Sequence, residues 1–119
     1  KKREEIAQKY RRAFEKVGID MPREYKNSKH GRHIFPIWVS AKKRDSILRY
    51  LNKKGVGAVI NYPAIHLFSY YRKQFGFHEG MFPNAEEIAN REISLPLYSK
   101  LKNNEINYVI KIVSAAVLI

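Results

Sequence analysis

The chain has 119 residues, of which 45% are hydrophobic and 13% aromatic, a composition that fits one globular domain and excludes a disordered segment. It contains no cysteine, which excludes disulfides and thiolate metal sites, and no run of about 18 apolar residues that would span a membrane. Lysine and arginine total 23 against 11 acidic residues, and this net charge of +12 favours anionic partners such as nucleic acid, phosphorylated metabolites or anionic membrane surfaces.

A solvated basic surface is the alternative explanation of the charge, because the basic residues are dispersed along the chain. The chain begins inside a charged helical pattern, without a methionine and without an apolar signal sequence. We therefore expect a piece of a longer protein. The absence of cysteine is compatible with a reducing compartment, and we expect a cytoplasmic location and no membrane partner.

The first predicted element is an amphipathic helix over about residues 3–16, because apolar side chains recur there at helical spacing and Gly18 can end the helix. A loop follows over residues 19–31. The segment RHIFPIWVS, residues 32–40, is rich in aromatic and branched side chains and predicts a strand. Pro36 within it favours an edge position or a bulge, because proline donates no hydrogen bond to a strand ladder.

Ser40 is a candidate cap for a second helix, which Gly55 ends. The short apolar run VGAVI, residues 56–60, predicts a buried strand. One or two helical turns are expected over residues 66–75, and a loop over residues 76–83.

A capping box opened by Asn84 predicts a helix through about Arg91. A short strand follows over residues 92–96, and Asn103 or Asn104 begins a final helix with one apolar stripe. The order of these elements predicts an α+β two-layer sandwich, in which helices pack on one face of a small, mostly antiparallel sheet.

No motif in the sequence supplies a complete catalytic site. The four histidines lie outside any metal-binding spacing, and a phosphate-binding loop, a dinucleotide fingerprint and a nucleophile elbow are all missing. The few carboxylates lie mostly in the first turns of predicted helices, where they complement the helix dipole. We therefore expect neither a metal site nor independent catalysis from this chain.

A cluster of aromatic and basic residues leaves a nucleic-acid-binding module open as an alternative function. Bases can stack on such aromatic rings while cations contact phosphates. No RNA-recognition, KH or helix-turn-helix signature accompanies the cluster, so nucleic acid is the less favoured partner. The cluster comprises Tyr62, Phe68, Tyr70, Tyr71 and Phe75, with Arg72 and Lys73.

Several segments, taken in order, resemble the C-terminal small domain of the DegT/StrS family of pyridoxal 5'-phosphate (PLP)-dependent aminotransferases. They are REEIAQKYRRAF, HIFPIWV, KRDSILRYLNKKGVGAVINYPAIH, YYRKQFG, FPNAEEIANREISLPLY and NNEINYVIKIV. Each segment alone is modestly specific, but their common order and spacing cover nearly the whole chain.

The resemblance implies that residues 1–119 form one small domain of a fold-type I aminotransferase. A large upstream domain would bind PLP and supply the lysine that binds it covalently, so this chain would hold no catalytic or cofactor-binding residue and be inactive alone. The full enzyme would transfer an amino group from a donor such as glutamate to a keto-sugar nucleotide, in the biosynthesis of amino sugars or polysaccharides. It would act as a homodimer.

The resemblance also implies a set of substrate-binding residues near the end of the predicted strand 56–60. Asn61 stands where many relatives have a histidine, and it can form hydrogen bonds but cannot titrate near neutral pH. Tyr62 keeps the aromatic ring of the family, and His66 matches the histidine that follows. Arg72 and Lys73 are candidates for contacts to a nucleotide diphosphate.

Two alternatives remain beside this interpretation: a stand-alone basic module for nucleic acid, and a family member with a dehydratase or regulatory role. The sequence leaves the sugar, the carbon position, the nucleotide and the pathway open.

Overall fold

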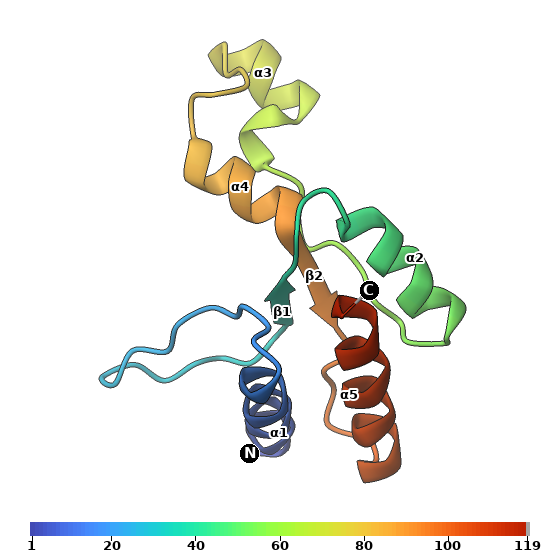
Figure 1. Cartoon of the computed structure of the whole chain (residues 1–119). Coiled ribbons are helices and arrows are strands. Elements are labelled where there is room, and N and C mark those ends of the chain that lie inside the picture. Colours follow the sequence, from blue (N-terminus) through green and yellow to red (C-terminus); the bar gives the residue numbers. More distant parts are fainter. Residues whose placement is uncertain (119) are drawn as a thin grey trace.

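The computed structural model describes residues 1–118 and contains helices packed around a pair of short strands (Figure 1). Strands β1 and β2 are antiparallel, with Phe35 opposite Leu95 and Ile37 opposite Ile93. The elements in chain order are α1 (Lys2–Lys16), β1 (Phe35–Trp38), α2 (Arg44–Lys53), the 3-10 helix η1 (Ile65–Leu67), α3 (Ser69–Phe75), α4 (Pro83–Arg91), β2 (Glu92–Leu95) and α5 (Asn103–Val117).

Helices α1, α2 and α5 form the layer that covers the strand pair. Helix α5 contacts both α1 and α2, and α2 also contacts β2. This arrangement confirms the predicted α+β fold with a small antiparallel sheet. Within residues 1–118, none of the helices has both the length and the apolar character that crossing a bilayer requires.

Aromatic side chains from α1 and β1 occupy the centre of the core. The ring of Tyr10 lies 5.7 Å from that of Phe14 and 5.1 Å from that of Phe35, and all three side chains are buried. The Tyr10 hydroxyl donates a hydrogen bond of 3.0 Å to the carbonyl oxygen of Pro96. A buried tyrosine thus satisfies its polar atom while it ties α1 to the chain after β2.

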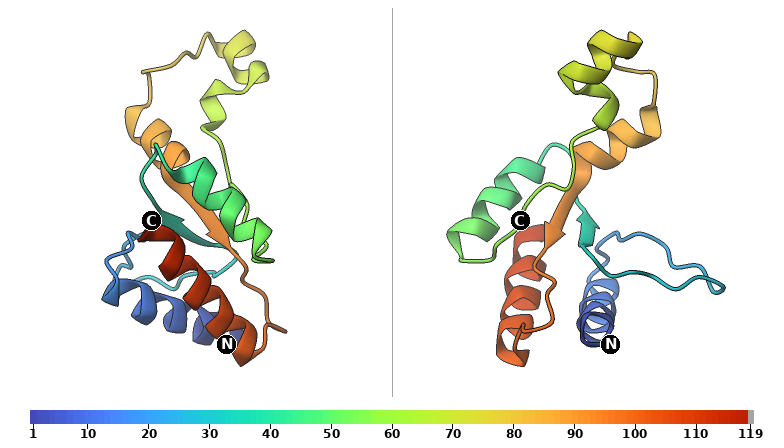
Figure 2. Two further views of the ribbon diagram at one scale, coloured as in Figure 1. Left: turned by 45° about the vertical axis from the view of Figure 1, so that its right-hand side comes forward. Right: turned by 180° about the vertical axis from the view of Figure 1, so that it is seen from behind.

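Residues 61–82 form an arm that extends away from the strand pair, with η1 nearer its base and α3 at its outer end (Figures 1 and 2). A row of ring contacts holds the arm together. Phe75 stacks on Phe77 with ring centroids 5.4 Å apart, and Phe77 contacts Phe82 edge-on at 5.5 Å. The ring of His66 lies 4.9 Å from that of Phe82. The one or two helical turns predicted for this region are confirmed.

The strand predicted over residues 56–60 is wrong except for a single bridge. Only Val59 pairs with Ser94, through backbone hydrogen bonds of 3.1 and 2.8 Å. The side chain of Asn52 bonds both backbone groups of Ala58, with its amide nitrogen 2.9 Å from the carbonyl oxygen and its amide oxygen 3.1 Å from the nitrogen. Because these groups are occupied, Ala58 has no strand partner and the pairing is confined to Val59.

Three predicted helix caps are wrong in position. Helix α2 begins at Arg44 rather than after Ser40, and α4 begins at Pro83. Asn84 therefore lies inside the first turn of α4 and not at the position that caps it, and proline suits the first helical position because it lacks an N–H group. Lys102 precedes α5, and its N–H donates to the Glu105 carboxylate over 2.7 Å, which replaces the cap expected from Asn103 or Asn104.

Truncation of a core side chain of β2 should destabilise the fold. We expect Ile93→Ala to lower the free energy of unfolding by about 2–5 kcal/mol, because Ile93 is fully buried between the strand and the helices. Ile65→Ala is the matched control, since Ile65 is 54% exposed. Urea denaturation of both variants measures the difference, and equal midpoints would contradict this description of the core.

Candidate functional site

The turn after Val59 is held against β2 by a buried carboxylate. Glu92, at the start of β2, is only 3% exposed. One of its oxygens accepts a 2.8 Å hydrogen bond from the backbone N–H of Asn61, and the other accepts a very short hydrogen bond from the hydroxyl of Ser94. Glu92 therefore fixes where the turn with Asn61 and Tyr62 begins.

Burial raises the pKa of the Glu92 carboxyl above its ordinary value, because the charged form loses its hydration. The hydrogen bonds from Ser94 and Asn61, and the positive charge of Arg44, oppose that shift without reversing it. The arm is thus anchored by a carboxylate whose ionisation is disfavoured by its surroundings.

A second polar pair holds the inner part of the arm to the start of α4. The Nε2 atom of His66 lies 2.7 Å from a carboxylate oxygen of Glu86, and the same oxygen accepts a 2.8 Å hydrogen bond from the N–H of Gly80. The hydrogen bond from His66 lowers the pKa of Glu86, so the carboxylate is ionised and Nε2 carries the proton. His66 is buried, and only its Nδ1 atom remains for a ligand.

The structure brings three of the five predicted site residues to the base of the arm. Tyr62 exposes 64% of its surface, Asn61 is half-buried, and His66 lies inside. A cavity of about 250 Å³ lies next to this turn, lined by Pro63, Leu67 and residues of α4, among others. None of the three predicted residues lines that cavity.

Arg72 and Lys73 lie apart from that turn, in the last turn of α3 at the outer end of the arm (Figure 2). Both side chains are exposed, and within residues 1–118 neither has a carboxylate partner. They are free to contact an anion, but this chain alone does not place them beside Asn61 and Tyr62.

The sequence reasoning missed Glu92, Ser94 and Glu86 as parts of the site. The strand pattern contained a usable signal, because side chains two residues apart lie on the same face of a strand. The spacing of Glu92 and Ser94 in an otherwise apolar strand thus predicts that their side chains lie on one face, where they can form a hydrogen bond. Glu86 lies within the segment for which the sequence predicted only a helix.

The lysines of residues 1–118 share a property that bears on covalent binding of a cofactor. Every lysine between residues 1 and 118 is exposed. A lysine that reacts with a carbonyl group is normally activated by desolvation in a pocket or by a neighbouring cation that lowers its pKa. The exposed lysines of this chain lack the desolvation that such activation uses.

Stability should reveal the buried acid through its pH dependence. Because the folded state raises the pKa of Glu92, its contribution is fully present below the ordinary value of 4.5 and is lost as the pH rises through the raised value. Glu92→Gln removes this charge, while its amide can still accept from Asn61 and donate to Ser94. We expect the wild type to lose stability relative to the variant between pH 4.5 and neutrality.

Thermal denaturation across that pH range measures the effect. Glu79→Gln is the matched control, because Glu79 is exposed and its carboxylate has no hydrogen bond or ion pair within residues 1–118. A constant difference between wild type and Glu92→Gln at all pH values would contradict a raised pKa.

Two known proteins are similar to this chain in sequence. Protein MJ1066 of Methanocaldococcus jannaschii is 38% identical over 123 residues, with 96% of this chain and 32% of that protein covered. The spore coat polysaccharide biosynthesis protein SpsC of Bacillus subtilis is 33% identical, with 95% of this chain and 31% of SpsC covered. This chain therefore spans about a third of the length of the curated relatives it matches.

One solved structure resembles this chain in fold and likewise extends well beyond it. Spr1654 of Streptococcus pneumoniae, assigned as a sugar aminotransferase and determined in its PLP form, superimposes with a TM-score of 0.88 at 26% identity. The match covers 98% of this chain and 31% of Spr1654. The model of the DegT/DnrJ/EryC1/StrS aminotransferase family matches residues 1–114, and the chain belongs to that family.

Proposed function

We propose that residues 1–119 are the C-terminal small domain of a PLP-dependent aminotransferase that acts on a keto-sugar nucleotide. The observation that carries the proposal is the family match over nearly the whole chain, together with coverage of only about a third of each relative. The exposed lysines agree with it, because the PLP-binding lysine would then belong to a large domain upstream.

The complete enzyme would take an amino group from a donor such as glutamate and deliver it to the sugar. When bound, PLP supplies the chemistry of amino transfer by acting as an electron sink. The name of SpsC supports a role in polysaccharide biosynthesis. We further propose a cytoplasmic homodimer, in which surfaces exposed on this chain contact the large domain or the second subunit.

The small domain would contribute position rather than chemistry. Glu92 holds the backbone of Asn61, and the exposed Tyr62 follows directly after it. In this proposal Asn61 and Tyr62 offer hydrogen bonds to the sugar, while the His66–Glu86 pair fixes the inner end of the same turn. Such orientation of a substrate lowers the entropic part of a reaction barrier. Arg72 and Lys73 are proposed to pair with the nucleotide diphosphate.

Absorbance spectroscopy tests the division of labour between the domains. Mixed with PLP, the 119-residue chain should show the spectrum of free PLP, because none of its lysines is desolvated. The protein extended by the sequence encoded upstream should shift that spectrum and transaminate. If the extended protein lacks both properties, the aminotransferase proposal is wrong, and a regulatory or dehydratase relative takes its place.

Kinetics of the extended enzyme test the role of the turn. Tyr62→Phe should lower kcat/KM for the sugar nucleotide about 2- to 10-fold, since the loss of one hydrogen bond costs about 0.5–1.5 kcal/mol. Tyr98→Phe is the control, because Tyr98 is similarly exposed but lies beyond β2. Equal kcat/KM values for both variants would remove Tyr62 from the proposed site.

A further inference from the structure

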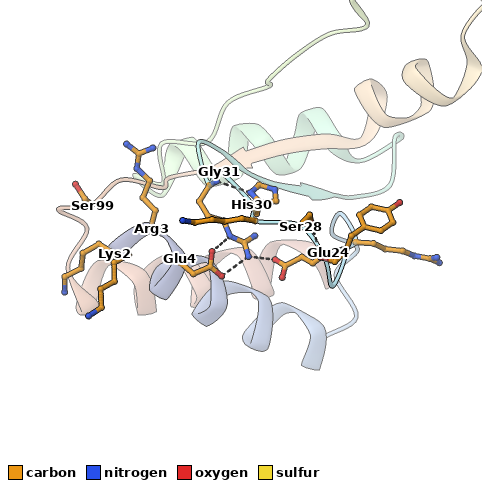
Figure 3. Close-up of a pocket in the computed structure, with 13 residues that line it drawn as sticks. Lys2, Arg3, Glu4, Glu24, Ser28, His30, Gly31 and Ser99 are labelled. Atoms are coloured by element: carbon orange, nitrogen blue, oxygen red, sulfur yellow. Dashed lines mark hydrogen bonds and ion pairs between the residues drawn. The ribbon is translucent and has the colours of Figure 1, made fainter.

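A basic cavity lies between the start of α1 and the loop that leads to β1 (Figure 3). Its volume is about 990 Å³, at the upper end of the range of small-molecule sites. We use the name basic cavity for the space lined by six cationic side chains: Lys1, Lys2, Arg3, Arg23, Lys29 and Arg32.

One wall of the basic cavity is built by a buried arginine. The side chain of Arg32 is 7% exposed and binds Glu4 through two nitrogens, at 2.5 and 2.9 Å. It also binds Glu24 at 2.5 Å, as the dashed lines in Figure 3 show. These ion pairs join the loop to α1, and bidentate pairs of this kind are geometrically specific. The cavity wall is therefore a defined structure.

The charge of the basic cavity remains strongly positive after these pairs are counted. Glu4 and Glu24 are its two carboxylates, and both already bind Arg32. Against the six cations they leave a net charge of +4 with His30 neutral. Lys2 has a weak contact of 3.8 Å to Glu5. The side chains of Lys1, Arg3, Arg23 and Lys29 have no carboxylate partner in residues 1–118, so an anion would meet unpaired cations.

Uncharged groups of the same cavity suit a larger phosphorylated ligand. Tyr25 lines the cavity with 77% of its surface exposed, and its ring offers a face for stacking a nucleobase. The Nδ1 atom of His30 accepts the N–H of Arg32 over 3.0 Å, so the proton of the neutral ring lies on Nε2. The hydroxyl of Ser99 adds a further donor.

We propose that the basic cavity binds a nucleoside diphosphate, whose phosphates pair with Arg23 and Lys29 and whose base stacks on Tyr25. Helix α1 and the loop after it, which supply most of the lining, lie at the opposite end of the molecule from the arm (Figures 1 and 2). This inference goes beyond the proposed function and does not rest on it, because the cations and the ring are present whatever reaction the complete protein performs.

Calorimetric titration of the chain with ADP, pyrophosphate and adenosine tests the inference. ADP should bind, adenosine should bind at least about tenfold more weakly, and the affinity for ADP should fall as salt is added. The double variant Arg23→Gln/Lys29→Gln should weaken ADP binding by about tenfold through the loss of two charge-assisted contacts. The matched control Lys53→Gln/Lys111→Gln removes the same charge elsewhere and should change it less than about twofold.

A second variant separates the base from the phosphates. Tyr25→Leu should weaken the binding of ADP about fivefold or more and leave pyrophosphate unchanged, because stacking contributes about 1–3 kcal/mol per base. Arg23, Lys29 and Tyr25 are exposed, so circular dichroism should show unchanged folding. Equal losses in the two double variants would reduce the effect to general charge, and adenosine binding as tightly as ADP would exclude phosphate recognition. Either result, or no ADP binding, overturns the inference.

Discussion

The position of the arm depends on the carboxylate of Glu92. This buried side chain belongs to the first residue of β2, and it accepts hydrogen bonds from a hydroxyl group of the same strand and from the first backbone N–H of the arm. The Val59–Ser94 bridge lies two residues before that contact, so backbone pairing and the buried acid act within one short segment. A buried carboxylate without partners would strongly destabilise a fold. Here both oxygens accept hydrogen bonds, which offset part of the cost of desolvation and fix the start of the arm.

The arm itself is stabilised mainly by its own side chains. Its ring contacts run from Tyr71 through Phe75 and Phe77 to Phe82, and the His66–Glu86 pair closes the arm onto α4. Of the aromatic cluster considered for stacking nucleic acid, Tyr71 and Phe75 take part in these contacts, while Phe75 itself stays 56% exposed. Two contacts hold the base of the arm, namely Glu92 with the N–H of Asn61 and Glu86 with His66. Tyr62 lies between them in the sequence and is exposed.

Much of the fold was predictable because helical periodicity is a strong signal over 10 or more residues. Helices α1 and α5 and the pairing segments β1 and β2 follow the pattern of apolar residues. The segment 56–60 failed because a side chain from the preceding helix, Asn52, took the backbone groups of Ala58. Such a contact leaves no periodic signal in the sequence.

The sequence located the residues of the turn in the candidate site, but not the carboxylates that hold that turn. Family resemblance located Asn61, Tyr62 and His66, but their partners Glu86 and Glu92 lie at least 20 residues further along the chain. The basic cavity was missed for the same reason, since its lining comes from the first helix, from a long loop and from Ser99. Composition showed the positive charge, and only the fold shows where it converges.

Arginine and lysine divide the positive charge of this chain between structure and surface. Arg91 donates to the carbonyl oxygen of Val39 at 3.0 Å, Arg44 donates to that of Ala89 at 3.0 Å, and Arg32 is enclosed by two carboxylates. The planar guanidinium, with its five donors, can satisfy several acceptors at once, whereas lysine is a strongly hydrated point charge. Every lysine of residues 1–118 is correspondingly exposed. These three arginines thus hold neighbouring segments in place, and most of the lysine charge stays available at the surface, where it attracts anionic ligands.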